Sequence, residues 1–78
     1  MKDILEYVLK GIVDKPEKIS VTESKEDDIT SLKIAVDKED IGKVIGKRGK
    51  VIKSIRSLLK VASIKNRQKI FLDTVEEA

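Results

Sequence analysis

The chain has 78 residues, of which 17 are Lys or Arg and 14 are Asp or Glu, and it contains neither cysteine nor histidine. A chain this short forms one small domain with a thin core. The missing residue types exclude thiol nucleophiles, imidazole bases and the usual zinc ligands, so we expect no enzyme, no metal and no cofactor. No apolar run approaches the roughly 20 residues of a membrane span, and we expect a cytoplasmic domain over residues 1–78.

The first segment has helical periodicity. Apolar residues at positions 4, 5, 8, 9 and 12 follow the i, i+3, i+4, i+7 spacing and predict an amphipathic helix over residues 2–13. Tyr7 falls outside this apolar stripe. The helix should stop before Pro16, because a residue that precedes proline is displaced from the α region.

Two segments with strand periodicity come next. In residues 18–23 and 30–36 apolar side chains alternate with polar ones, which predicts two strands with one buried face each. A short charged turn over residues 25–28 joins them, so the pair should form an antiparallel hairpin. The side chains expected to face inward are Ile19, Val21, Leu32, Ile34 and Val36.

A pair of helices should follow the hairpin. Asp37 and Asp40 have the spacing of a capping box and predict a short helix over residues 39–45. A glycine turn interrupts it, and a second helix is predicted from residue 50 to about residue 62. On a helical wheel the cations of this helix lie opposite its apolar face. The apolar face comprises Val51, Ile52, Ile55, Leu58, Leu59 and Ala62.

The last segment predicts a strand over residues 68–73, reached through a polar connection over residues 63–67. Ile70 and Leu72 should face inward and Phe71 outward, and residues 73–78 should form a frayed acidic tail. Because a helical crossover precedes this strand, it should run parallel to the strand before the helices. The predicted fold is therefore α+β, in the order α-β-β-α-α-β, with a three-stranded mixed sheet and three helices on one face.

Positive charge is concentrated around the glycine turn. Residues 41–60 contain seven cations and no acid, and they include three of the four glycines. The remainder of the chain has an excess of acids, so a modest net charge hides a positive site suited to phosphates. Its cations are Lys43, Lys47, Arg48, Lys50, Lys53, Arg56 and Lys60.

The turn itself, Gly46-Lys47-Arg48-Gly49, has a physical basis for anion binding. Its glycines permit backbone angles and close approaches that a Cβ would block. The two cations between them should point into solvent, beside the positive N-terminal end of the next helix. The spacing fits neither a Walker loop nor a dinucleotide-binding fingerprint, because Gly42 and Gly46 enclose three residues and a helix precedes the turn.

The run from Ile41 to Ile52, IGKVIGKRGKVI, resembles the signature of a KH domain. The order of elements is similar to the bacterial, type II arrangement of that domain. The resemblance covers the whole chain and extends to the small single-KH proteins of the KhpA (YlqC) family. It implies a domain that holds about four single-stranded nucleotides, with the glycine loop clamping the backbone.

By this resemblance, Gly46, Lys47, Arg48, Gly49 and Lys50 would contact the RNA backbone. Ile41, Val44, Ile45 and Ile52 would line an apolar groove beneath the bases, whose edges would be read from the strand before the helices; which of the four point into the core is left open. Lys43, Lys53, Arg56 and Lys60 would form an auxiliary basic face, although a charged solvent face is also usual for an amphipathic helix.

The resemblance also implies an RNA chaperone or post-transcriptional regulator, in some members linked to cell elongation, cell shape and wall synthesis. It implies a homodimer, or a heterodimer with a larger KH-containing protein of the Jag/KhpB type. Two alternatives stay open: a protein-interaction module that acts mainly as a dimerisation partner, and a binder of single-stranded DNA. Leu58 and Val61 are candidates for a dimer surface, although Leu58 is more simply explained as core.

Overall fold

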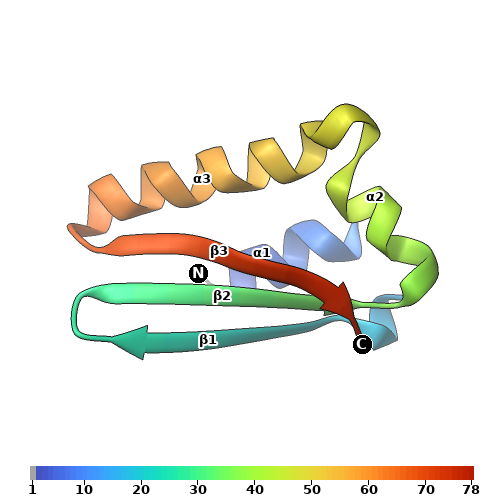
Figure 1. The fold of residues 1–78 in the computed structure, drawn as a ribbon, viewed down its shortest axis with the longest axis horizontal. Coiled ribbons are helices and arrows are strands. Elements are labelled where there is room, and N and C mark those ends of the chain that lie inside the picture. Colours follow the sequence, from blue (N-terminus) through green and yellow to red (C-terminus); the bar gives the residue numbers. More distant parts are fainter. Residues whose placement is uncertain (1) are drawn as a thin grey trace.

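The computed structural model describes residues 2–78, and Met1 lies outside the described residues. Three helices lie on one side of a three-stranded sheet, which makes an α+β fold (Figure 1). Single 3-10 turns cover Pro16–Lys18, Lys38–Asp40 and Lys47–Gly49. The longer elements are α1 (Lys2–Lys10), β1 (Ser20–Glu26), β2 (Ile29–Val36), α2 (Ile41–Ile45), α3 (Lys50–Asn66) and β3 (Lys69–Glu77).

The sheet has the order β1-β2-β3, with β1 antiparallel and β3 parallel to the central strand β2. The predicted mixed sheet is therefore confirmed. The pairing of β2 with β3 is regular up to Leu32 and Leu72, but Lys33 then pairs with Thr74. Asp73 is the extra residue of this β-bulge, and a bulge bends its strand and redirects a side chain.

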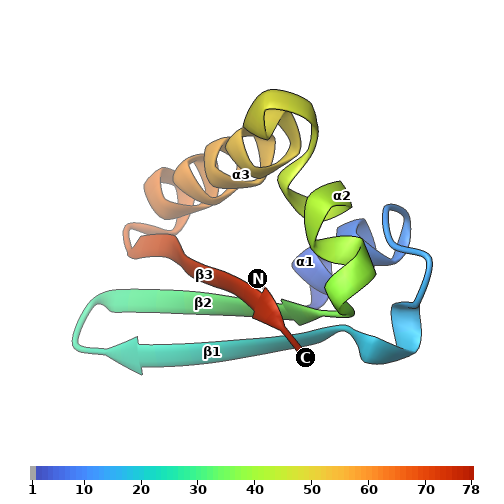
Figure 2. The ribbon, with the colours of Figure 1, turned by 45° about the vertical axis from the view of Figure 1, so that its right-hand side comes forward.

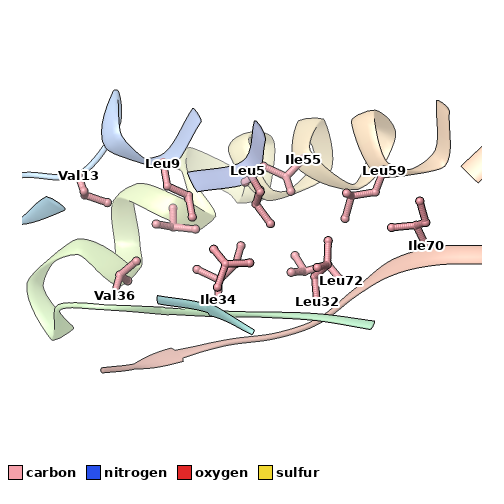
Figure 3. Close-up of a cluster of buried hydrophobic side chains, with 12 residues drawn as sticks. Leu5, Leu9, Val13, Leu32, Ile34, Val36, Ile55, Leu59, Ile70 and Leu72 are labelled. Carbon is pink, nitrogen blue, oxygen red and sulfur yellow. The ribbon is translucent and has the colours of Figure 1, made fainter. Parts of the chain in front are cut away.

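The core lies between the sheet and the helices (Figure 3). Alternate residues of β2 supply its floor, and residues one turn apart on α1 and α3 supply its roof, as the periodicities predict. Each buried Val, Leu or Ile contributes about 1.5–3 kcal/mol. The buried apolar residues are Leu5, Leu9, Val13, Val21, Leu32, Ile34, Val36, Val44, Ile55, Leu59, Ile70 and Leu72.

Helix α1 is shorter than predicted and ends at Lys10 rather than at Val13. Gly11 follows its last residue, a position where glycine is common because the chain can turn away there. The Gly11 amide donates to the Val8 carbonyl at 3.2 Å, a contact between residues three apart that tightens the end of the helix. Val13 is nevertheless buried, because the chain folds back over the core.

Helix α3 is longer than predicted and runs through the expected polar connection to Asn66. Polar side chains in this stretch bond to carbonyls of their own helix, so they do not compete for the backbone amides that hold it. The Ser63 hydroxyl lies 2.9 Å from the Leu59 carbonyl oxygen, and the Asn66 amide donates to the Ala62 carbonyl at 3.0 Å. The helix ends where Arg67 adopts a left-handed conformation with φ 54°.

Strand β3 also extends further than predicted. Residues 74–77, expected in a frayed tail, pair with β2, and the Ala78 amide donates to the Val36 carbonyl at 2.8 Å. The eight-residue strand β2 offers a full edge, so backbone pairing holds a segment whose acidic composition suggested disorder. Within the part of the chain that the structure describes, no helix is long and apolar enough to cross a membrane.

Candidate nucleic-acid interface

The glycine turn connects α2 to α3 at the end of the molecule opposite the α3–β3 connection (Figures 1 and 2). Three of its four residues have positive φ: Gly46 at 80°, Arg48 at 57° and Gly49 at 72°. Arg48 is not a glycine, and a left-handed conformation costs such a residue about 1–2 kcal/mol. The turn therefore stores backbone strain at the position that presents a cation, a feature associated with functional sites.

Besides its positive φ, a close approach of the backbone requires glycine at position 46. A Cβ placed on it would lie 2.5 Å from Val51 Cγ2, 2.7 Å from Val51 N and 2.8 Å from Val51 Cβ. The turn thus lies directly against the first helical residues of α3. Gly49 has more room, since a Cβ added there would lie 3.7 Å from its nearest neighbour, and Gly42 has open space around it. The three glycines of the motif therefore differ in how strictly the structure requires them: Gly46 by its φ and the close contact, Gly49 by its φ alone, and Gly42 by neither.

The cations of the turn are free to meet a ligand. Lys47, Arg48 and Lys50 are exposed, and no side chain caps the N-terminus of α3. Among residues 2–78, ion pairs join only Lys15 and Lys43 to acids, so the cations of the turn have none. A 17-residue helix directs the positive end of its dipole toward the same place.

Lys43 differs from the other predicted cations of the site. Its ammonium group forms an ion pair with Asp14. The hydrogen bond to Asp14, with the nearby charges of Asp14, Asp40 and Glu39, raises the pKa of Lys43 against the opposing effect of burial. The positive charge of Lys43 is therefore partly neutralised, which separates it from Lys47 and Arg48.

A buried carboxylate fixes the start of α2. Asp40 is 1% exposed, and its two oxygens accept hydrogen bonds from the amides of Asp14 at 3.1 Å and Lys15 at 3.0 Å. Burial alone would raise the pKa of Asp40, but these two hydrogen bonds and the charges of Lys43 and Lys15 lower it overall. The predicted capping box is thus only half present: Asp37 accepts from the Glu39 amide at 2.9 Å, whereas Asp40 binds the loop after α1.

A groove lies next to the glycine turn, between the helices and β3. Ile45 of α2 and Ile52 of α3 line a cavity of about 290 Å³, together with Arg56. The opposite wall consists of Leu72, Asp73, Thr74 and Val75. The strand that borders the groove is therefore β3, whereas the resemblance implied β2. The reason is that α3 packs against β3, which lies beside β2 at one edge of the sheet.

Two of the four residues expected in the groove occupy it. Ile45 and Ile52 line the cavity, Val44 is fully buried in the core, and Ile41 is half-buried and packs against that core. The sequence did not point to Asp73, which lines the groove as the extra residue of the β-bulge. No periodic pattern marks a bulge, so local spacing carried no signal for this residue.

The cations of the auxiliary basic face have different surroundings. Lys53, Arg56 and Lys60 are all exposed on α3, but only Arg56 lines the groove beside Ile52. Lys60 lies one turn further along and lines a second cavity, which also includes Arg56. The face is therefore not uniform, and its members differ in their distance from the glycine turn.

Comparison with known proteins identifies the family of this chain. Residues 2–73 match the model of the KH domain of KhpA and KhpB. The chain belongs to the KhpA/KhpB family. It is 40% identical to the RNA-binding protein KhpA of Clostridium perfringens over 75 residues, which cover 96% of this chain and 100% of that protein.

Other KhpA proteins are similar to the same extent. The RNA-binding protein KhpA of Chlamydia caviae is 40% identical over 99% of both chains, and that of Listeria monocytogenes is 38% identical over 97% of this chain and 100% of its own. These family members are named as RNA-binding proteins and not as enzymes, which agrees with the expectation of a non-catalytic chain.

A solved structure supports the fold. Era of Aquifex aeolicus, crystallised with GDP and AlF4⁻, superposes with a TM-score of 0.66 over 99% of this chain. The identity is 19%, and this chain spans 30% of the Era chain, so the likeness concerns the fold alone. A KH-like arrangement of elements is thus present in a solved structure with little sequence in common.

Proposed function

We propose that this KhpA/KhpB family member binds single-stranded RNA, with the turn Gly46–Gly49 holding the phosphate backbone. The observation that carries the proposal is an exposed, strained turn with two free cations beside an apolar groove. Phosphates would meet Lys47, Arg48, Lys50 and the N-terminal end of α3. Bases would lie over Ile45 and Ile52, against the edge of β3.

This arrangement separates two tasks. Contacts to phosphates fix the position of the strand and supply most of the affinity, whereas contacts to base edges supply the sequence preference. A groove that reads about four nucleotides carries little sequence information. We therefore expect broad RNA binding that weakens as salt rises, as suits an RNA chaperone or post-transcriptional regulator; a link to cell elongation and wall synthesis is implied by the family resemblance only.

The proposal is tested with the double substitution Lys47→Asp and Arg48→Asp. Binding of a mixed-sequence RNA of about ten nucleotides should be lost, while circular dichroism should stay that of the wild type, because both side chains are exposed. Lys18→Asp with Lys33→Asp is the matched control, since it makes the same change in charge at exposed positions away from the turn. An equal loss of RNA binding in both variants would show that the effect depends on net charge and not on the turn.

The same assay compares RNA with single-stranded DNA. Nothing in the turn selects for the 2′-hydroxyl, so a DNA strand of the same sequence is an informative competitor. If DNA displaces RNA at equal concentration, the chain is a general single-strand binder. If neither nucleic acid binds to the folded wild type, the proposed function is wrong.

A protein partner is a second candidate, supported by one observation. Helix α3 exposes apolar side chains at Leu58 (40% exposed), Val61 (62%) and Ile64 (73%). Leu58 is thus not part of the core, contrary to the simpler interpretation of the helical wheel. We propose that this stripe mediates pairing with a second copy or with a larger KH-containing protein, and sedimentation of wild type and Val61→Asp tests it. A monomeric wild type would exclude the homodimer.

A further inference from the structure

A second cavity lies between α3 and β3, further from the glycine turn than the groove described above. Its volume is about 350 Å³. Helix α3 lies along β3 (Figure 1). Residues of these two elements line the cavity. Its lining residues are Arg56, Leu59, Lys60, Ser63, Lys69, Ile70, Phe71 and Leu72.

The two cavities are adjacent. Both are lined by Arg56 and Leu72, so the first ends where the second begins. The second extends along α3 from Arg56 to Ser63, which is about 10 Å at 1.5 Å per residue. Stacked nucleotides rise about 3.4 Å each, so this length accommodates about three further nucleotides. A strand that leaves the groove next to the glycine turn therefore has a path that continues along the same helix.

The second cavity has a fixed shape because Ser63 ties its two walls together. The Ser63 hydroxyl accepts a hydrogen bond from the Ile70 amide at 2.8 Å and lies 3.0 Å from the Ile70 carbonyl oxygen. The peptide groups of Ile70 thus face α3 instead of β2. Since peptide groups alternate along a strand, those of Leu72 face the same cleft. Because Ser63 already bonds the peptide groups of Ile70, the floor offers the backbone donor and acceptor of Leu72 as well as apolar side chains.

The charge of the cavity favours an anionic occupant. Arg56, Lys60 and Lys69 line it, and none of its lining residues is acidic. The apolar part, which includes Leu59, Ile70 and Leu72, resembles the floor expected beneath bases. Cations along an apolar cleft with an accessible strand edge suit a phosphodiester chain with flat bases. An acidic peptide would satisfy the cations but would not account for the position of the cavity next to the groove.

We propose that the binding groove extends from the glycine turn into this second cavity, so that the site holds about seven nucleotides of single-stranded RNA. Lys60 and Lys69 contact the additional phosphates, and the additional bases lie between α3 and β3. This inference rests on the proposed function, because it lengthens the same site. It also makes the KH domain a reader of longer single-stranded segments than four nucleotides.

The test is a length series of RNAs with 4, 6 and 8 nucleotides, titrated into wild type and into Lys60→Glu with Lys69→Glu. On a four-nucleotide site, an 8-nucleotide RNA has five binding registers and therefore gains about fivefold in affinity over the tetranucleotide. The affinity of the wild type for the 8-nucleotide RNA should exceed this statistical gain. The variant should keep only that statistical gain. Loss of two phosphate contacts should also lower the salt slope of the longest RNA by about 1.4.

Lys33→Glu with Lys65→Glu is the matched control, since both lysines are exposed and neither lines the two cavities. It should retain the length dependence of the wild type. Amide shifts in NMR titrations locate the effect: Ile70 and Leu72 should respond to the 8-nucleotide RNA more than to the tetranucleotide. An identical length dependence in wild type and variant would overturn the extended site.

The two proposals fail in different ways. If the Lys47→Asp, Arg48→Asp variant binds the tetranucleotide as tightly as the wild type, the glycine turn is not the site and the proposed function is wrong. If the tetranucleotide requires the turn but longer RNAs gain only the statistical factor, the proposed function stands and the extension is wrong.

Discussion

Replacing Gly46 with alanine tests whether the close approach to Val51 defines the turn. At φ 80° and ψ 168° the backbone occupies a region essentially restricted to glycine, which costs another residue about 1–3 kcal/mol. The new Cβ would also overlap Val51, at 2.7 Å from its nitrogen and 2.8 Å from its Cβ, and overpacking costs about 1–3 kcal/mol more. The free energy of unfolding should therefore fall by about 2–6 kcal/mol.

That loss is large for a domain of this size. At about 0.05–0.15 kcal/mol per residue, 78 residues give a total stability of about 4–12 kcal/mol. Urea unfolding followed by circular dichroism measures the change. Gly42→Ala is the matched control, because its Cβ would meet nothing within 4 Å and alanine favours a helix by about 0.5–1 kcal/mol. This variant should be as stable as the wild type or more so.

Adding Val51→Ala to the Gly46→Ala variant separates the two causes. The second substitution removes Val51 Cγ2, the atom at 2.5 Å, but leaves the nitrogen and the backbone strain. Once the usual cost of truncating a half-buried valine is subtracted, the free energy of unfolding should therefore recover only in part. A Gly46→Ala variant within about 1 kcal/mol of the wild type, or a full recovery in the double variant, would refute the reasoning from backbone approach.

Three further variants test other contacts of the site. Asp40→Asn should lower Tm by about 5 °C or more, because an amide cannot accept from both the Asp14 and Lys15 amides. Since the folded pKa of Asp40 is lowered, its contribution is present above the ordinary carboxyl pKa and disappears as pH falls through the folded value, so thermal melts of wild type and Asp40→Asn should converge in acid. Ser63→Ala should cost about 1–3 kcal/mol in urea unfolding, because the Ile70 amide loses its partner. Lys43→Ala should weaken RNA binding less than Lys47→Ala, because Asp14 already pairs with Lys43, and equal losses would argue against that pairing.

The sequence was sufficient wherever a local pattern determines the structure. Strand periodicity predicted the inward faces of β2 and β3, and the glycine spacing located the turn between α2 and α3 to the residue. These features depend on neighbours two to four positions apart. The corresponding predictions were therefore right both in type and in position.

Several of the misses have a different origin, because they depend on contacts that local spacing does not reveal. Asp40 bonds to amides 25 and 26 residues away, so the capping-box pattern gave it the wrong contact. Asp73 lines the groove at a shift of register against β2, and Leu58 is exposed although its helical-wheel position suggested burial. The resemblance implied that β2 borders the groove, whereas β3 lines it, because strand pairing decides which strand lies beside α3.

The position of β3 has a consequence for the order in which the protein becomes competent during synthesis. One wall of the groove and the floor of its extension come from residues 69–77, which pair with a strand about 40 positions earlier. A nascent chain that has exposed the glycine turn but not these residues has cations for phosphates and no place for bases. On the proposed binding mode, selective binding would therefore begin only once β3 has left the ribosome, whereas electrostatic attraction to nearby RNA would begin earlier.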